Sequence, residues 1–215
     1  MKKLLKKITP LYKLYLFLYH SRTKLYNYLV IPSYEVKRNT IITIAKKYNA
    51  LNVFLETGTY MGDTVEYLKN NFSKLISIEL NEDLAVKAKK RFAAENKIQI
   101  VQGDSAKELS AILAPISMPV VFWLDGHYSS EFWAGGEYIV TAKGDKETPI
   151  LEELGHIARH PVKNHIILID DARLFKGEHD YPHMNELSGF VKSNFPNHKL
   201  HVAKDIIRIL PFGNK

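Results

Sequence analysis

The sequence predicts an α/β protein built on a mostly parallel sheet with helices on both faces. Two observations carry this prediction: short apolar, β-rich runs alternate with helical patterns, and the last two runs are separated by only two residues. The first five runs lie at 52–56, 74–79, 98–102, 120–125 and 166–170, and the helical patterns lie at 35–48, 62–71, 82–95, 105–113, 149–160 and 184–194. Lys204 and Asp205 alone separate the strands at 198–203 and 206–210. Because so short a connection joins only antiparallel neighbours, we expect seven strands that end in an antiparallel hairpin.

The composition is that of an ordinary globular protein. The chain has 215 residues, of which 46% are hydrophobic and 25% charged, and it has no cysteine. These values exclude a disordered, collagen-like or disulfide-stapled protein, and the length suits one domain with an appendage. The absence of cysteine also excludes zinc–thiolate centres, iron–sulfur clusters and a cysteine nucleophile.

The basic excess lies near the N-terminus. The formal net charge is +7, and residues 1–38 hold nine of the 30 Lys and Arg residues against one acidic residue, Glu35. We divide the chain into a basic, aromatic helical appendage at 1–34 and an α/β domain at 35–215. For residues 1–30 three interpretations stay open: packing on the domain or in a homo-oligomer, peripheral membrane contact, and polyanion binding. The charge balance elsewhere argues against a nucleic-acid partner, and we expect a cytoplasmic protein.

Polar residues follow the first strand. Glu56 ends it, and a turn with Thr57, Gly58, Thr59 and Gly62 leads into the next helix. The glycines allow close approach of a ligand to the backbone, and the helix N-terminus offers free N–H groups, although a purely structural turn has the same pattern. A carboxylate here would repel a pyrophosphate but attract the amino group of a zwitterionic ligand. The turn therefore favours a nucleoside without phosphates.

The next two strands also end in acidic residues. Glu79 stands where a carboxylate accepts both hydroxyls of a ribose. Asp104 and Ser105 follow the third strand, where an adenine ring would lie, and capping of the next helix is their alternative role. Together the three strand ends suit an adenosine with an amino-acid tail.

The series Glu56-x-Gly58-x-x-x-Gly62, Glu79, Gly103-Asp104 and Asp125 resembles motifs I to IV of class I S-adenosylmethionine (SAM)-dependent methyltransferases. The resemblance covers about residues 50–211. It implies a Rossmann-like seven-stranded sheet with the cofactor bound at the strand ends. The implied cofactor-binding residues are Glu56, Thr57, Gly58, Thr59 and Gly62 near the methionine portion, Glu79 at the ribose, and Asp104, Ser105 and Asp125 near the adenine and the reacting centre. Aminopropyl transferases share the scaffold, so the fold alone does not determine the reaction.

Three carboxylates follow the fourth and fifth strands. Asp125 faces the pair Asp170 and Asp171 across one crevice, and such oxygen ligands suit Mg²⁺. The arrangement is similar to that of metal-dependent O-methyltransferases, which implies Asp125, Asp170 and Asp171 as metal ligands. Capping and solvent-exposed loop positions are the alternative roles for the same three residues.

His127 is the predicted general base, with Asp125 as the second catalytic residue. An imidazole titrates near neutral pH, and methyl transfer to a hydroxyl must remove its proton; a turn residue bonded to backbone is the other interpretation. We therefore expect methyl transfer from SAM to an oxygen acceptor such as a sugar, glycan or small natural-product hydroxyl, with divalent-metal assistance. A non-catalytic membrane-associated or oligomeric binding protein and another adenosine-using transferase are the alternatives.

Overall fold

The structure, a computed structural model, describes residues 31–127, 131–134, 137–140 and 144–212. Its centre is a seven-stranded sheet in the order β3-β2-β1-β4-β7-β9-β8. The strands are β1 (Val53–Thr57), β2 (Lys74–Glu79), β3 (Ile98–Gln102), β4 (Val120–Leu124), β7 (Ile166–Ile169), β8 (His198–Ala203) and β9 (Ile206–Pro211). The first five of these are parallel, and β9 runs antiparallel to both β7 and β8. The predicted fold class is confirmed, including the terminal hairpin.

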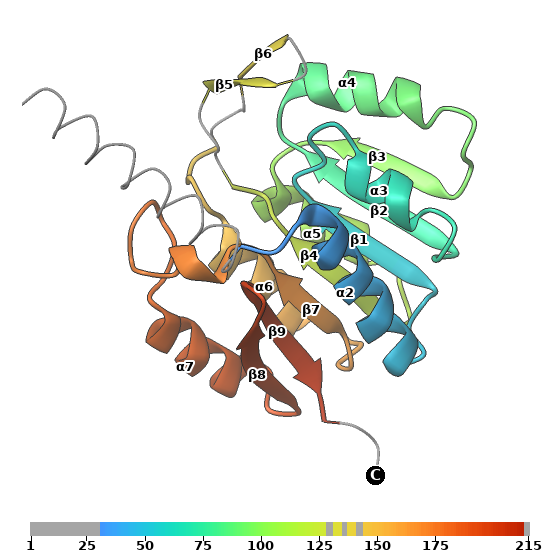
Figure 1. Ribbon diagram of the computed structural model, residues 1–215. Helices are drawn as coiled ribbons and strands as arrows, with labels where there is room; N and C mark the ends of the chain where they lie inside the picture. Colours follow the sequence, from blue (N-terminus) through green and yellow to red (C-terminus); the bar gives the residue numbers. More distant parts are fainter. Residues whose placement is uncertain (1–30, 128–130, 135–136, 141–143, 213–215) are drawn as a thin grey trace, which may run out of the picture.

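In the part of the chain that the structure describes, six α-helices cover the sheet (Figure 1). They are α2 (Tyr34–Lys47), α3 (Asp63–Leu68), α4 (Glu82–Arg91), α5 (Ser105–Leu113), α6 (Ile150–Arg159) and α7 (Met184–Asn194). Ser33, Asn81 and Asp104 cap α2, α4 and α5, each accepting a backbone N–H of the first turn, which satisfies donors that a helix start leaves free. The helices α3 and α4 end earlier than predicted, before stretches that contain asparagines and form turns.

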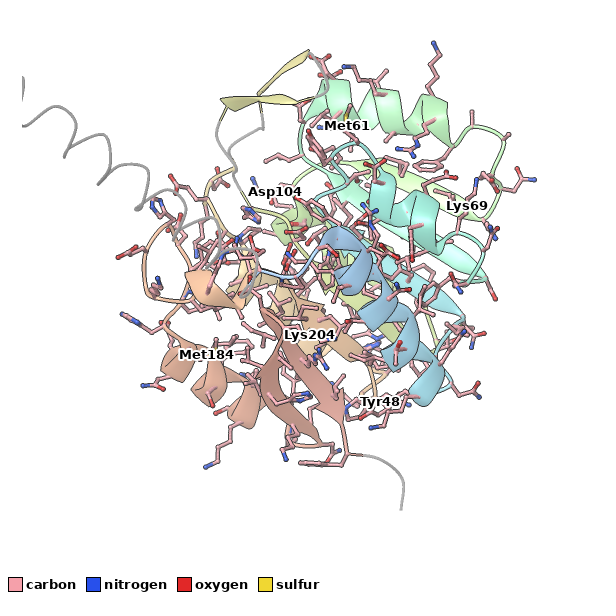
Figure 2. All side chains as sticks on the ribbon, in the orientation of Figure 1. Tyr48, Met61, Lys69, Asp104, Met184 and Lys204 are labelled. Carbon is pink, nitrogen blue, oxygen red and sulfur yellow. The ribbon has the colours of Figure 1, made fainter. Side chains whose placement is uncertain are left out.

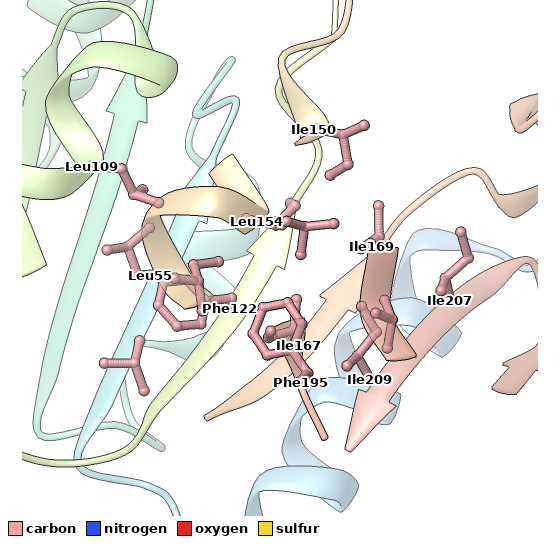
Figure 3. Close-up of a cluster of buried hydrophobic side chains, with 14 of the residues drawn as sticks. Leu55, Leu109, Phe122, Ile150, Leu154, Ile167, Ile169, Phe195, Ile207 and Ile209 are labelled. Atoms are coloured by element: carbon pink, nitrogen blue, oxygen red, sulfur yellow. The ribbon is translucent and has the colours of Figure 1, made fainter. Parts of the chain in front are cut away.

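Alternating side chains of the buried strands divide the core into two layers. Leu55 and Phe122 face the layer that α5, α6 and α7 cover, whereas Phe54 faces the layer of α2 and α3. Figure 3 shows Leu109 and Leu154, from α5 and α6, packed over the strands in the first layer. Both faces of the sheet are therefore buried, as a parallel sheet requires.

Two features fall outside the sequence prediction. The strands β5 (Glu131–Ala134) and β6 (Glu137–Val140) pair with each other and lie outside the main sheet. A short 3₁₀-helix, η1 (Ala172–Leu174), follows β7.

The hairpin between β8 and β9 turns at Lys204 and Asp205, both of which have positive φ. This is the conformation that a tight two-residue hairpin demands.

The appendage interpretations concern residues 1–30, which lie outside the described part of the chain. Within the described part, no helix has the length and apolar character to span a membrane.

Candidate functional site

A cavity of about 950 Å³ opens at the carboxyl end of the parallel strands. It lies beside the point where β1 and β4 are neighbours and the strand order reverses, which is where open α/β sheets bind ligands. Its described lining includes ten of the predicted residues: Glu56, Gly58, Thr59, Glu79, Asp104, Ser105, Asp125, His127, Asp170 and Asp171. Figure 2 shows Asp104 and Met61 at this end of the sheet and Tyr48 at the opposite end.

The turn after β1 is shaped by close backbone packing. Gly58 has φ +84°, and a Cβ there would lie 2.5 Å from the backbone oxygen of Asp125. The loops after β1 and β4 therefore meet without room for a side chain. Gly62 and Thr57, also predicted to bind the cofactor, do not line the cavity: Gly62 packs against Phe92, and the Thr57 hydroxyl accepts the Asp125 backbone N–H at 3.3 Å.

Glu79 is held in place by the backbone. Its Oε2 accepts the N–H of Tyr60 at 2.8 Å, and its Oε1 accepts the N–H of Asn81 at 2.9 Å. Burial raises the pKa of Glu79, although these hydrogen bonds oppose the shift. Tyr60 itself has φ +49°, a conformation that is rare outside glycine. The backbone of this loop is therefore strained where the Tyr60 N–H reaches the Glu79 carboxylate.

Glu56 is buried at the floor of the cavity. Burial raises its pKa to about 8, against the opposing effect of the Ser77 hydroxyl, which donates to Oε2 at 2.7 Å. Ser77 is in turn 2.6 Å from the hydroxyl of Thr59. A cationic ligand group beside Glu56 would favour its ionised form, so this position suits the ammonium of an amino-acid tail.

The residues after β3 combine capping with cavity lining. Asp104 accepts the N–H of Ala106 at 3.0 Å as the cap of α5. Ser105 donates to Glu153 on α6 at 2.6 Å. Glu153 is 1% exposed, and burial raises its pKa to about 7. The capping role is thus present for Asp104, while Ser105 ties α5 to α6 beneath the cavity.

The carboxylates of Asp170 and Asp171 are paired with a lysine that is distant in the sequence. The ammonium Nζ of Lys37, in the first turn of α2, lies 2.6 Å from Asp170 Oδ1 and 3.2 Å from Asp171 Oδ1. All three residues are buried. Burial would lower the pKa of Lys37, but the charge of Asp170 and the hydrogen bond to it outweigh this and raise the pKa. Lys37 is therefore a protonated, buried partner of both carboxylates.

A second cation approaches Asp171 from its other side. Arg173 Nη1 lies 2.7 Å from Asp171 Oδ1, and the same guanidinium pairs with Asp205 of the β8–β9 turn. Burial would raise the pKa of Asp171, but Lys37 and Arg173 outweigh it and lower the pKa. Asp171 also has φ +55°, so a strained backbone holds this carboxylate between the two cations.

His127 lies between the carboxylates. Its Nδ1 is 3.4 Å from Asp125 Oδ1, and its Nε2 is 4.0 Å from Asp171 Oδ2. Burial would lower the pKa of His127, yet the hydrogen bond to Asp125 and the surrounding carboxylates raise it above 6.5. With Nδ1 directed to Asp125, a neutral ring presents its lone pair at Nε2.

The structure brings the three predicted metal ligands to one place but does not fit a divalent cation there. Lys37 already supplies positive charge to Asp170 and Asp171, and a second cation would meet electrostatic repulsion. Among the described residues, no group of three or more His, Asp or Glu side chains is arranged to hold a metal ion.

Sequence reasoning missed Lys37, Arg173 and Glu153. Lys37 entered the sequence analysis only as one of the basic residues of 1–38 and was not predicted as a site residue; it lies on α2. Glu153 lies in the first turn of a helix, where acidic residues are common at the surface. Arg173 is two residues after Asp171, and that proximity is the one sequence signal that pointed to it.

No protein-family model matches the sequence, and no curated protein is similar to it. Solved structures are similar in fold. An O-methyltransferase from Bacillus cereus in complex with S-adenosylhomocysteine (SAH) has a TM-score of 0.57 at 12% identity, over 89% of this chain and 87% of that one. An SAH-bound methyltransferase from Podospora anserina has a TM-score of 0.56 at 13% identity, over 85% and 80%.

An N-methyltransferase, NodS from Bradyrhizobium japonicum, has a TM-score of 0.52 at 12% identity, over 82% of this chain and 95% of that one. These similarities establish that the chain has the fold of class I SAM-dependent methyltransferases. They include enzymes named for oxygen and for nitrogen acceptors.

Proposed function

We propose that the protein transfers a methyl group from SAM to an oxygen acceptor, with a sugar, glycan or small natural-product hydroxyl as the acceptor class. One observation carries the proposal: Glu56, Glu79 and Asp104, from three successive strand ends, line a single cavity that continues to His127. A ligand with a cationic tail and a ribose matches that order of groups.

The charge of the cavity supports a cationic ligand. Its described lining holds ten carboxyl groups and five Lys or Arg side chains. An excess of one sign in a cleft concentrates ligands of the opposite sign. When bound, SAM would supply an electrophilic methyl group on a positively charged sulfur. Glu79 would hold the ribose, Glu56 the ammonium group, and Asp104 the adenine side of the cavity.

His127 accounts for the proton of the acceptor. A hydroxyl that attacks the methyl group must lose its proton, and a neutral imidazole within the cavity accepts it at Nε2. Asp125 orients the ring through Nδ1 and stabilises the imidazolium that results. The departing thioether is neutral and needs no acid, so alignment of the acceptor is the main remaining requirement.

Calorimetric titration with SAM and SAH tests the cofactor. We expect both to bind and NAD and UDP-glucose not to bind. Glu79→Ala should weaken SAM binding by about 10- to 100-fold, because it removes charge-assisted hydrogen bonds. Glu82→Ala, an exposed acidic residue on α4, is the matched control. Failure of wild type to bind SAM or SAH would refute the proposal.

The pH profile of methyl transfer tests the base. Hydroxyl-bearing sugars, glycans and natural products would be screened with methyl-labelled SAM. Once an acceptor is known, turnover should rise with pH as His127 loses its proton. Because the pKa of His127 is raised, the midpoint of this rise should lie above pH 6.5. His127→Asn should lower turnover by about 100- to 10,000-fold, with His201→Asn on β8 as control. Asp125→Asn should move the midpoint to lower pH, and an unmoved midpoint would exclude His127 as the titrating base.

A further inference from the structure

The site contains a cation that belongs to the chain itself. Lys37 is 5% exposed, although lysine is among the residues least often buried. Its Nζ contacts Asp170 and Asp171, and Asp125 adds a further attractive charge. The positive charge is thus located beside the three carboxylates that resemble a metal-ligand set.

Two buried carboxylates, with the half-buried Asp125 near them, repel one another unless a cation lies between them. Removing a charge from water is costly, and the cost is recovered only by a close opposite charge with hydrogen bonds. A divalent metal would meet this requirement. In this chain the ammonium of Lys37 meets it with hydrogen bonds of 2.7 and 3.2 Å to the two aspartates.

We propose that Lys37 is a resident cation that takes the place of a divalent metal and that its ammonium binds the acceptor oxygen. The second part of this proposal rests on the proposed methyl transfer. An ammonium has three N–H donors, and it donates one hydrogen bond to Asp170, whose two oxygens lie 2.6 and 2.7 Å from Nζ, and one to Asp171 Oδ1 at 3.2 Å. The third suits the oxygen of an acceptor hydroxyl in the cavity that Lys37 lines.

The resulting step is balanced. The acceptor oxygen forms a bond to the methyl carbon as the carbon–sulfur bond breaks, and the electron pair of that bond leaves with the neutral thioether. The hydroxyl proton passes to His127 Nε2, and Lys37 keeps its own protons. Lys37 thus stabilises the negative charge that develops on the acceptor oxygen. A divalent metal would give the same electrostatic stabilisation.

Arg173 has a different role. Its guanidinium joins Asp171 to Asp205 in the hairpin turn, and Asp205 also accepts the Arg173 backbone N–H at 2.9 Å. One partner lies in the loop after β7, and the other lies in the turn between β8 and β9. Arg173 therefore positions that loop, and Lys37 is the cation that is placed between the carboxylates.

Direct measurement of Mn²⁺ binding tests the first part without cofactor or acceptor. Electron paramagnetic resonance distinguishes free from bound Mn²⁺. Wild type and Lys37→Arg should leave Mn²⁺ free, because both keep a positive charge at the carboxylates. Lys37→Met removes the charge but keeps most of the apolar stem, and it should bind Mn²⁺ at least about tenfold more tightly than wild type. Lys46→Met, an exposed position on the same helix, should behave as wild type.

The outcomes separate clearly. Tight Mn²⁺ binding by wild type that Asp170→Asn abolishes would overturn the proposal, and this arm does not depend on how any lysine variant folds. A folded Lys37→Met protein that gains no Mn²⁺ binding would also overturn it, because the carboxylates would not then form a cation site. Gain of binding in Lys37→Met, lost again in Lys37→Met with Asp170→Asn, would support it.

Turnover tests the second part. Wild-type methyl transfer should be unchanged by a chelator, whereas Lys37→Met should lose about 100-fold in turnover and regain part of it when Mn²⁺ is added. A purely structural lysine would give no metal rescue. If SAM does not bind but Lys37→Met gains Mn²⁺, the proposed function fails and the resident cation stands. If SAM binds and the wild-type protein also binds Mn²⁺, the cofactor part of the proposed function stands and the resident cation fails.

Discussion

A cluster of buried polar groups lies at each end of the sheet, and the two clusters differ in charge. At the carboxyl end, the Lys37 ammonium is paired with Asp170 and Asp171 beside an open cavity. At the other end, His160 Nδ1 is 2.9 Å from His165 Nε2, and His165 Nδ1 accepts the Val120 N–H at 3.1 Å. His160 Nε2 is 3.1 Å from the Leu113 oxygen, and His198 Nε2 is 2.9 Å from the His165 oxygen.

These contacts define a histidine network, which consists of His160, His165 and His198. His160 donates through Nε2 and accepts through Nδ1, so His165 donates through Nε2 and keeps Nδ1 as an acceptor. Burial and the neighbouring histidines lower the pKa of His165 to about 3. The hydrogen bonds of the histidine network stabilise the fold, whereas the cluster at the other end holds the Lys37 charge beside the cavity.

A substitution at the carboxyl end of the sheet should have the largest effect on SAM binding. Gly58→Ala places a Cβ against the Asp125 backbone oxygen at a positive φ. We expect a loss of about 3 kcal/mol in unfolding free energy and about 100-fold in SAM affinity. Gly189→Ala on α7, where a Cβ would meet nothing within 4 Å, should be neutral or stabilising. Chemical denaturation and calorimetry measure both; equal behaviour of the two variants would contradict the packing argument.

A substitution in the histidine network should affect stability alone. His165→Ala leaves the Val120 N–H and the His160 ring without partners, and we expect a loss of about 2–4 kcal/mol in unfolding free energy. SAM affinity of the folded protein should change less than about twofold, because the network lies at the opposite end of the sheet. His201→Ala is the control for loss of a histidine near this edge. A large change in SAM affinity would show that the two ends are coupled.

The smallest expected effect is the pH dependence of the unfolding free energy, in which the two ends of the sheet should contribute over different pH ranges. His165 has a folded pKa below its unfolded value of 6.5, so its contribution is complete above 6.5 and is lost as pH falls toward 3. Glu56 has a folded pKa of about 8, above its unfolded value of 4.5, so its contribution is complete below 4.5 and is lost as pH rises toward 8. Each slope is about 1.4 kcal/mol per pH unit.

The variants assign each limb of that profile. His165→Ala should flatten the acid limb, and Glu56→Gln should flatten the alkaline limb. Exchange of these effects, or no effect on either limb, would mean that the two ends do not titrate as the contacts indicate.

The fold was predictable because its signals are local. The strands at 74–79, 98–102 and 198–203 have the predicted bounds, since apolar β-rich runs end at polar turns. The hairpin of β5 and β6 was missed, although Gly135 and Gly136 stand between its two strands and Gly-Gly is a known hairpin signal.

The site was predictable only in part. Glu56, Glu79, Asp104 and Asp125 follow strands whose order in the sheet is implied by the pattern, so their convergence on one cavity could be foreseen. Lys37 could not be placed, because 133 residues separate it from Asp170 and helix periodicity does not show which basic residue turns inward. The magnesium prediction is not supported for that reason: the sequence showed the carboxylates without the lysine between them.

The chain of charges from Lys37 through Asp171 and Arg173 to Asp205 joins residues near both ends of the domain. During synthesis the Asp pair leaves the ribosome well before the hairpin turn that contains Asp205. Arg173 therefore gains its second carboxylate only after almost the whole domain has been made. A chain that ended before Asp205 would therefore lack one of the two carboxylates that hold Arg173, and the loop after β7 would lose its ionic attachment to the hairpin turn.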